Sequence, residues 1–218
     1  MGKRFGVMQG VSLFGVVGML LAGAGCSGTA KRLQLENQQL LDNISRLQRE
    51  NAELASMTSQ YESELNRLEN SRKELEAKLS GTGATARVKD GALSVLLPGS
   101  ILFDPGKTQL RPQSKTTLKT IADILKSDVP NETVRIEGHT DSDPIKKHKD
   151  MYKSNWELST ARATTVLHFM IEECGLSPTR IYVAGFGQHQ PIADNNTTAG
   201  KAKNRRVEFV ILSRGSGG

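Results

Sequence analysis

The sequence predicts an α+β fold: a βαβαβ two-layer sandwich, in which helices cover one face of a mixed sheet, preceded by a long α-helical coiled coil. Three observations lead to this prediction. Strand-like and helix-like apolar patterns alternate after residue 87, leucines recur every seventh residue before it, and the N-terminus is apolar and rich in glycine. The chain therefore divides into an N-terminal segment, a rod and one globular domain.

The charge of the chain is unevenly distributed. Its 218 residues have a net charge of +6, yet residues 31–80 carry eight Lys or Arg against nine Asp or Glu. Residues 81–218 carry nineteen against fourteen, which favours an anionic partner such as nucleic acid, lipid headgroups or an acidic cell-wall polymer. Aromatic residues make up only 5% of the chain and do not alternate with basic ones, so we expect no nucleic-acid binding.

The first 25 residues read as an export signal. Lys3 and Arg4 precede the apolar run Phe5–Gly25, which ends in small residues. A basic start, an apolar middle and small residues at the break predict a secretory signal peptide over residues 1–25. The alternative is an uncleaved transmembrane anchor, because 21 residues are enough to span a bilayer. Both interpretations place the remainder of the chain outside the cytoplasm.

The residue after this run is Cys26. Small residues ending at a cysteine resemble the lipobox of bacterial lipoproteins. The resemblance implies cleavage before Cys26 and attachment of diacylglycerol and an N-acyl chain, so that residues 26–32 form a lipidated N-terminus in the bilayer. Three acyl chains hold a protein durably, whereas one binds only marginally. Ser27, rather than Asp, follows the cysteine, and the same resemblance then favours the outer membrane, facing the periplasm.

Residues 33–79 predict a coiled-coil spacer, about 70 Å long at the helical rise per residue. The d positions of the heptad recur at a spacing of seven: Leu33, Leu40, Leu47, Leu54, Tyr61, Leu68 and Leu75. The a positions, four residues later, are Asn37, Ile44, Asn51, Thr58, Leu65, Arg72 and Leu79. Buried Asn at a positions favours a parallel, in-register homo-oligomer, and we expect a dimer. The alternative is a single amphipathic helix that packs on the globular domain.

Small residues over 80–86 predict a flexible linker, followed by the globular domain over 87–213 and a flexible tail over 214–218. Apolar alternation predicts strands, and apolar spacing of three and four predicts helices. The expected strands or extended pieces are Gly91–Pro98, Ile101–Phe103, Val134–Gly138, Arg180–Gly185 and Val207–Leu212. The expected helices are Pro112–Ser127 and Asn155–Glu173, and the stretch from Gly185 to Thr198 is expected to be mostly loop.

A candidate site lies where the second expected helix begins. Ser154 and Glu157 form a capping box, and Arg162 follows about two turns later. Helical side chains lean towards the N-terminus, so Arg162 can reach back over the first turns, towards Asp141 at the end of a strand. Such a pair suits a small zwitterion, with the guanidinium on its carboxylate and Asp141 on its ammonium. The alternative is a salt bridge that braces the fold.

Several ordered motifs are similar to the OmpA/MotB family of peptidoglycan-binding domains. The resemblance covers Ile101–Leu212. The matching motifs are Phe103-Asp104, Gly138-His139-Thr140-Asp141, Asn155-x-x-Leu158-Ser159-x-x-Arg162-Ala163, Gly185-Phe186-Gly187 and Asn204-Arg205-Arg206-Val207. The run from Ser154 to Ser159 and the long loop before it resemble the MotB-type branch rather than the porin branch.

The resemblance implies a ligand and a set of site residues. Asp141 and Arg162 would hold the diaminopimelate of the peptidoglycan stem peptide without a covalent bond. Thr140, Asn155, Leu158 and Ser159 would line the pocket. Arg205 or Arg206 would contribute, and we assign Arg206 to the predicted site.

Other chemistries find little support in the sequence. The four histidines have no metal-ligand spacing, and no nucleophile elbow or paired catalytic carboxylates are apparent. We therefore expect no enzyme activity, no metal and no cofactor. Cys174 is expected to be a small core residue, and two distant cysteines do not form a disulfide framework.

The expected function is a non-catalytic lipoprotein that ties the outer membrane to the cell wall. The alternative is an inner-membrane structural or stator-type subunit, similar to MotB, with an uncleaved N-terminal helix. A stator needs a carboxylate within the membrane to carry protons, and Phe5–Gly25 contains no Asp or Glu, so a proton-channel role is not expected.

Overall fold

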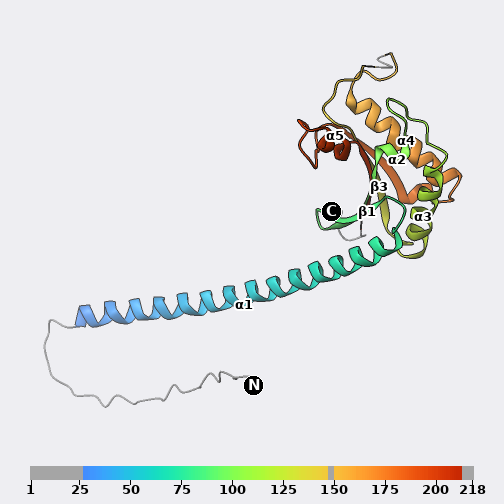
Figure 1. The fold of residues 1–218 in the computed structure, drawn as a ribbon. Coiled ribbons are helices and arrows are strands. Elements are labelled where there is room, and N and C mark those ends of the chain that lie inside the picture. Colours follow the sequence, from blue (N-terminus) through green and yellow to red (C-terminus); the bar gives the residue numbers. More distant parts are fainter. Residues whose placement is uncertain (1–26, 147–149, 213–218) are drawn as a thin grey trace, which may run out of the picture. The chain divides into compact units, whose positions relative to one another are not determined.

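The computed structural model describes residues 27–146 and 150–212 (Figure 1). The expected signal peptide, the expected acylation site Cys26 and the expected tail over 214–218 lie outside the described residues. Contacts divide the chain into two compact units, residues 1–57 and 58–218, which we describe separately. Within the described ranges, no helix is both long enough and apolar enough to cross a membrane.

In the first unit, the described residues belong to one long helix, α1 (Ser27–Lys78), which continues into the second unit. Its heptad leucines Leu33, Leu40, Leu47 and Leu54 are exposed. The other faces carry mostly glutamine, asparagine, serine and charged residues, although Leu35, Leu41 and Met57 are also exposed there. A narrow exposed leucine stripe on an otherwise polar helix is typical of a coiled-coil seam.

In the second unit, the last turns of α1 pack on the globular domain. Leu68, Leu75 and Leu79 are buried, and the last two belong to the same core cluster as the sheet. Lys78 forms an ion pair with Asp128 at the end of α3 (Ser114–Ser127). The sequence pattern assigned these leucines to a helix–helix seam, but an apolar stripe does not specify which surface covers it. For this stretch the packed-helix alternative describes the structure.

The stretch expected as a flexible linker is an ordered turn and the start of a strand. Gly81 and Gly83 have φ of 79° and 74°, a conformation that favours glycine. Ala84 and Ala86 are buried in the core, and β1 (Thr85–Lys89) begins within the expected linker. Small residues are present because the chain turns tightly and packs closely, which produces the same composition as a linker.

The domain is built on one five-stranded mixed sheet, in the order β1-β2-β5-β3-β4. Besides β1, its strands are β2 (Ala92–Pro98), β3 (Thr133–His139), β4 (Ile181–Gly187) and β5 (Arg206–Leu212). β3 and β4 are parallel, and the other neighbours are antiparallel. The parallel pair is connected by α4 (Asn155–Glu172), as a parallel connection requires a crossover.

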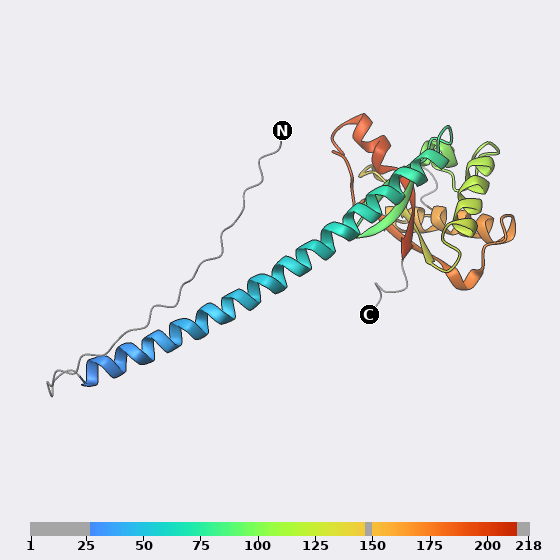
Figure 2. The same cartoon turned by 90° about the horizontal axis from the view of Figure 1, so that it is seen from below.

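Helices α3 and α4 cover one face of the sheet (Figure 1, Figure 2). Their apolar stripes pack against the inward side chains of the central strands, with Ile136 and Phe209 fully buried between them. The stripes consist of Leu118, Ile121 and Leu125 on α3 and of Ala163, Val166 and Met170 on α4. Cys174 packs against this core as expected. The predicted α+β sandwich, with helices on one face of a mixed sheet, is confirmed.

Three short elements differ from the sequence prediction. Ile101–Phe103, expected to be extended, lies mostly in a helical turn, α2 (Gly99–Leu102), and Phe103 makes only an isolated bridge to Leu110. The helix α5 (Thr198–Asn204) begins at the last residue of the expected loop, in a stretch for which no element was predicted. A 3₁₀ turn, Pro178–Arg180, precedes β4. A helix of three to seven residues makes at most about two turns, which is too short for a periodic apolar signal.

Candidate functional site

Five of the seven expected site residues line a cavity of about 350 Å³ at the carboxyl end of β3. Thr140 and Asp141 directly follow that strand, and α4 begins on the other side of the cavity. The lining residues are Pro105, Gly106, Thr140, Asp141, Asp143, Pro144, Ile145, Lys146, Tyr152, Asn155, Leu158, Arg162 and Arg205. Its size is that of a pocket for a small molecule, and both signs of charge line it.

Glycines at the ends of β3 and β4 bring α4 close to the sheet. A Cβ at Gly138 would lie 2.0 Å from the carbonyl oxygen of Ser159, and one at Gly185 would lie 2.0 Å from Thr160 Oγ1. No side chain larger than hydrogen fits at either position. The close approach places the first turns of α4 beside the end of β3, where the cavity forms.

The start of α4 is fixed by the expected capping box. Ser154 is the N-cap, and its Oγ accepts a hydrogen bond of 3.2 Å from the backbone N–H of Trp156. The Ser154 hydroxyl also donates to the carboxylate of Glu157, which lowers the pKa of that carboxyl below its usual value. The helix therefore begins at the position that the sequence predicts.

Asn155 connects three segments at the rim of the cavity. Its Nδ2 donates to the carbonyl oxygens of Asp141 and Asp143, at 3.3 and 3.0 Å, and to Oε1 of Gln188, at 3.1 Å. The acceptors belong to the loop after β3 and the turn after β4. Asn155 is thus a positioning residue that holds both loops to the N-terminus of α4.

Asp141 is nearly buried and carries the negative charge of the cavity. Its Oδ2 forms an ion pair with Nη1 of Arg205, which follows α5, and its Oδ1 accepts from the backbone N–H of Asp143 at 3.2 Å. A carboxylate offers about four acceptor positions. These protein contacts leave acceptor positions for a ligand donor.

Arg162 is 7% exposed and approaches the same cavity from α4. Its Nε donates to the carbonyl oxygen of Lys107 at 3.1 Å, and its guanidinium lies 5.2 Å from the ring centre of Phe103. Burial lowers the pKa of Arg162 below its ordinary value, while the charge of Asp141 opposes that effect. A buried guanidinium with one backbone hydrogen bond retains donors for an anionic ligand.

Two expected residues do not line the cavity. Ser159 is fully buried; its hydroxyl donates to the carbonyl oxygen of Trp156 at 2.9 Å and accepts from the N–H of Gly187 at 3.0 Å. Arg206 is also buried, paired with Glu208 on the other face of the sheet. Arg205, rather than Arg206, lines the cavity, which corrects our assignment.

The alternation of side chains along the last strand could have shown which of the two arginines faces away from the cavity. Arg206 precedes the inward-facing Val207 in β5, so strand alternation directs Arg206 to the face away from the helices. Sequence reasoning also missed lining residues from two loops, namely Pro105 and Gly106 before α3, and Ile145, Lys146 and Tyr152 before α4. No periodic pattern marks loop residues, so they could be found only from coordinates.

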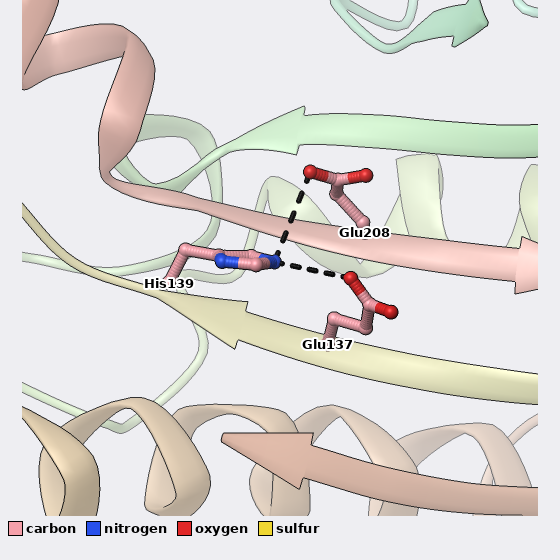
Figure 3. A group of neighbouring side chains, drawn as sticks. All are labelled: Glu137, His139 and Glu208. Atoms are coloured by element: carbon pink, nitrogen blue, oxygen red, sulfur yellow. Dashed lines mark hydrogen bonds and ion pairs between the residues drawn. The ribbon is translucent and has the colours of Figure 1, made fainter. Parts of the chain in front are cut away.

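A second polar cluster lies on the face of the sheet opposite the helices. Cross-strand pairing sets Glu137 of β3 opposite Glu208 of β5, and His139 lies next to both (Figure 3). His139 Nε2 is 3.2 Å from Glu137 Oε2 and 3.8 Å from Glu208 Oε1. All three are buried, and their ligand atoms lie within 4.8 Å of one another.

The charges around this cluster disfavour a divalent cation. Arg87 and Arg206 pair with Glu208, while Lys89 and Arg135 pair with Glu137, so four cations surround two carboxylates. Burial lowers the pKa of His139, which keeps the ring neutral with its proton towards Glu137. The Nδ1 atom then has no partner among the described residues. The cluster is a buried ion-pair network of the sheet rather than a metal centre.

Comparisons with known proteins agree with the fold and the motifs. Residues 102–205 match the model of the OmpA family. Motility protein B of Bacillus subtilis (strain 168) is 36% identical over 143 residues, 66% of this chain and 50% of that protein. "Probable lipoprotein YiaD" of Escherichia coli (strain K12) is 33% identical over 138 residues, 63% of this chain and 59% of that protein. The chain thus spans little more than half the length of these relatives.

A solved structure extends the likeness. The crystal structure of a MotB-like protein from Desulfovibrio vulgaris has a TM-score of 0.62 at 26% identity, covering 71% of this chain and 96% of that one. The relatives named here are thus a motility protein, a probable lipoprotein and a MotB-like protein. The mixed sheet, the ordered motifs and the family match together identify residues 102–205 as an OmpA family domain, similar to that of MotB.

Proposed function

We propose that this protein binds peptidoglycan by holding the diaminopimelate of the stem peptide in the cavity between Asp141 and Arg162. One observation carries the proposal: a buried carboxylate and a buried guanidinium from separate segments line the same small cavity. The side-chain end of diaminopimelate carries both an ammonium and a carboxylate. Asp141 would accept from the ammonium, and Arg162 with Arg205 would donate to the carboxylate. Each such charged hydrogen bond contributes about 1.5–3 kcal/mol.

The direct test is retention on purified, insoluble peptidoglycan. Residues 27–218, which lack the N-terminal segment, are incubated with the polymer as wild type, Asp141→Asn or Arg162→Ala. We expect both variants to lose most of the retained fraction. Asp123→Ala and Arg46→Ala remove one exposed charge of each sign elsewhere and should bind as wild type. Equal retention of all five proteins, with unchanged circular dichroism, would contradict the proposal.

The finer part of the proposal is a lipid anchor at Cys26 in the outer membrane, so that the protein connects that membrane to the cell wall. The support is the lipobox-like run that ends at Cys26, and the similarity to a relative named as a lipoprotein. The coiled-coil segment would act as the spacer, and its exposed heptad leucines would pair with a second copy.

A second candidate is an inner-membrane, stator-type subunit with an uncleaved Phe5–Gly25 segment. The similarity to Motility protein B favours it. The lack of Asp or Glu in that segment argues against a proton-carrying role. Mass spectrometry of the mature N-terminus separates the two: a triacylated Cys26 excludes the uncleaved anchor, and an intact Met1 excludes the lipoprotein.

A further inference from the structure

An exposed aromatic pair lies beside the cavity. The rings of Trp156 and His189 stack with centroids 4.9 Å apart and an interplanar angle of 20°. Trp156 is the single tryptophan of the chain and is 47% exposed. A large apolar ring left this exposed at a concave surface is typical of a binding surface.

The pair is held rigidly from both sides. The carbonyl oxygen of Trp156 accepts from the hydroxyls of Ser159 and Thr160, at 2.9 and 2.8 Å. The N–H of His189 donates to the carbonyl oxygen of Phe186 at 3.1 Å, closing the turn after β4. Gly187, with φ of 53°, packs that turn against the start of α4. The backbone of both residues is therefore fixed, and the rings stack on each other, which reduces the entropy lost on binding.

The pair borders a second cavity, of about 700 Å³, which adjoins the first. Pro144, Ile145 and Asn155 line both cavities. Polar groups of Lys153 and Gln188 complete the wall around the rings. A ligand that extends through both cavities would place a zwitterionic end in the first. Its other end, in the second cavity, would have a flat apolar face against the rings and polar groups at its edges.

We propose that Trp156 and His189 form a subsite for an N-acetylated sugar of the glycan strand from which the stem peptide branches. A pyranose ring presents C–H groups on its face, and these carry the partial positive charge that the electron-rich face of an aromatic ring attracts. Hydroxyl and acetamido groups at the edge of the sugar would pair with Lys153 and Gln188. This inference rests on the proposed function, because the sugar is recognised as the continuation of the stem.

The chain length of the ligand agrees with this arrangement. Two amino acids separate diaminopimelate from the lactyl group of the sugar, and each extended residue spans at most about 3.6 Å. The sugar therefore lies within about 11 Å of the diaminopimelate. A cavity that shares three lining residues with the first is within this reach.

The test compares two soluble probes by titration calorimetry: the free tripeptide that ends in diaminopimelate, and the same tripeptide on its N-acetylglucosaminyl-N-acetylmuramyl disaccharide. Residues 27–218 should bind the disaccharide probe about 3- to 10-fold more tightly than the free tripeptide. Trp156→Ala should remove that difference and leave the tripeptide affinity unchanged, while Trp156→Phe should retain part of it. Tyr182→Ala, which removes another exposed aromatic ring, should behave as wild type.

The single tryptophan supplies a second readout. Its fluorescence emission should shift with the disaccharide probe and not with the tripeptide. Equal affinity of wild type for both probes, or an equal loss of both in Trp156→Ala, would overturn the sugar subsite and leave the stem site standing. If wild type binds neither probe, the proposed function itself fails.

Discussion

Neighbouring arginines have opposite surroundings at the end of α5. Arg205 has a side chain that is 42% exposed and pairs with Asp141 at the cavity, whereas Arg206 is buried against Glu208. Arg205 is partly exposed, and Asp141 keeps the charge of Arg162 nearby when Arg205 is removed, so this pair contributes little to stability. Removing Arg206 instead takes one cation from a carboxylate that is fully buried. We therefore expect Arg205 to matter mainly for binding and Arg206 mainly for the stability of the fold.

We expect Arg205→Ala to weaken retention on peptidoglycan and to change the free energy of unfolding by less than about 1 kcal/mol. Arg206→Ala should lower that free energy by about 3–5 kcal/mol, because Glu208 stays buried with one cation fewer. Urea unfolding and the retention assay measure the two effects. A large loss of stability in Arg205→Ala with normal binding would contradict the assignment.

The buried network makes stability depend on pH. Burial alone would raise the pKa of Glu137, yet hydrogen bonds from His139, Lys89 and Arg135 lower it to about 2, from 4.5 in a solvated chain. Between these values the unfolded chain binds a proton that the folded protein does not bind. The stabilisation is complete above pH 4.5 and is lost as the pH falls through about 2, by about 3 kcal/mol in total.

Urea unfolding between pH 2 and 6 tests this, with Glu137→Gln as the comparison. Glu137→Gln is expected to have a lower free energy of unfolding at neutral pH. That free energy should also fall less steeply as the pH is lowered, because the variant lacks the titrating carboxyl group. If the free energy of unfolding depends on pH in the same way in both proteins, another carboxyl group is responsible for the loss of stability in acid.

The sequence singled out residues that the structure brings together, since five of them line one cavity, while their part in binding stays a prediction. They are Thr140, Asp141, Asn155, Leu158 and Arg162. Their positions follow from a strand end and a helix start, which apolar periodicity and a capping box reveal. The choice of Arg206 over Arg205 failed because the motif, rather than strand alternation, guided it.

At the scale of elements, the approach of α4 to the sheet builds the cavity. Gly138→Ala places a methyl group on the backbone of Ser159, a contact that only a shift of α4 can relieve. We expect a loss of about 1–3 kcal/mol in stability, together with weaker retention on peptidoglycan. Gly28→Ala, at a position with no atom within 4 Å, is the matched control.

Thermal unfolding measures the loss of stability, and the retention assay on the same preparations measures the loss of binding to peptidoglycan. Normal binding by a stably folded Gly138→Ala protein would show that the distance between α4 and β3 does not set the cavity.

The long elements were predictable, and the short ones were not. Strands β2 to β5 and helices α3 and α4 lie within a few residues of their expected bounds, because each has a clear apolar stripe. β1 was missed since its small residues resemble a linker, although Ala86 pairs with Val95 in the sheet. The tertiary contact, not the local pattern, decides its conformation.

At the scale of the whole molecule, the exposed heptad stripe predicts self-association. Light scattering on residues 27–218 should give twice the mass of one chain, and Leu40→Lys with Leu47→Lys should give a single-chain mass, because two charges would enter the seam. Glu53→Lys, outside the a and d positions, should leave the mass unchanged. A single-chain mass for wild type at high concentration would contradict the proposed oligomer.

The burial of Leu75 and Leu79 in the domain core has a mechanical consequence. Tension between a membrane and the wall would enter the domain through the end of α1, where no slack segment separates the helix from β1. The load would act directly on packed side chains and on the backbone ladder between β1 and β2. Under tension, the domain should therefore stay folded up to a defined unfolding force, without an earlier extension of a flexible segment.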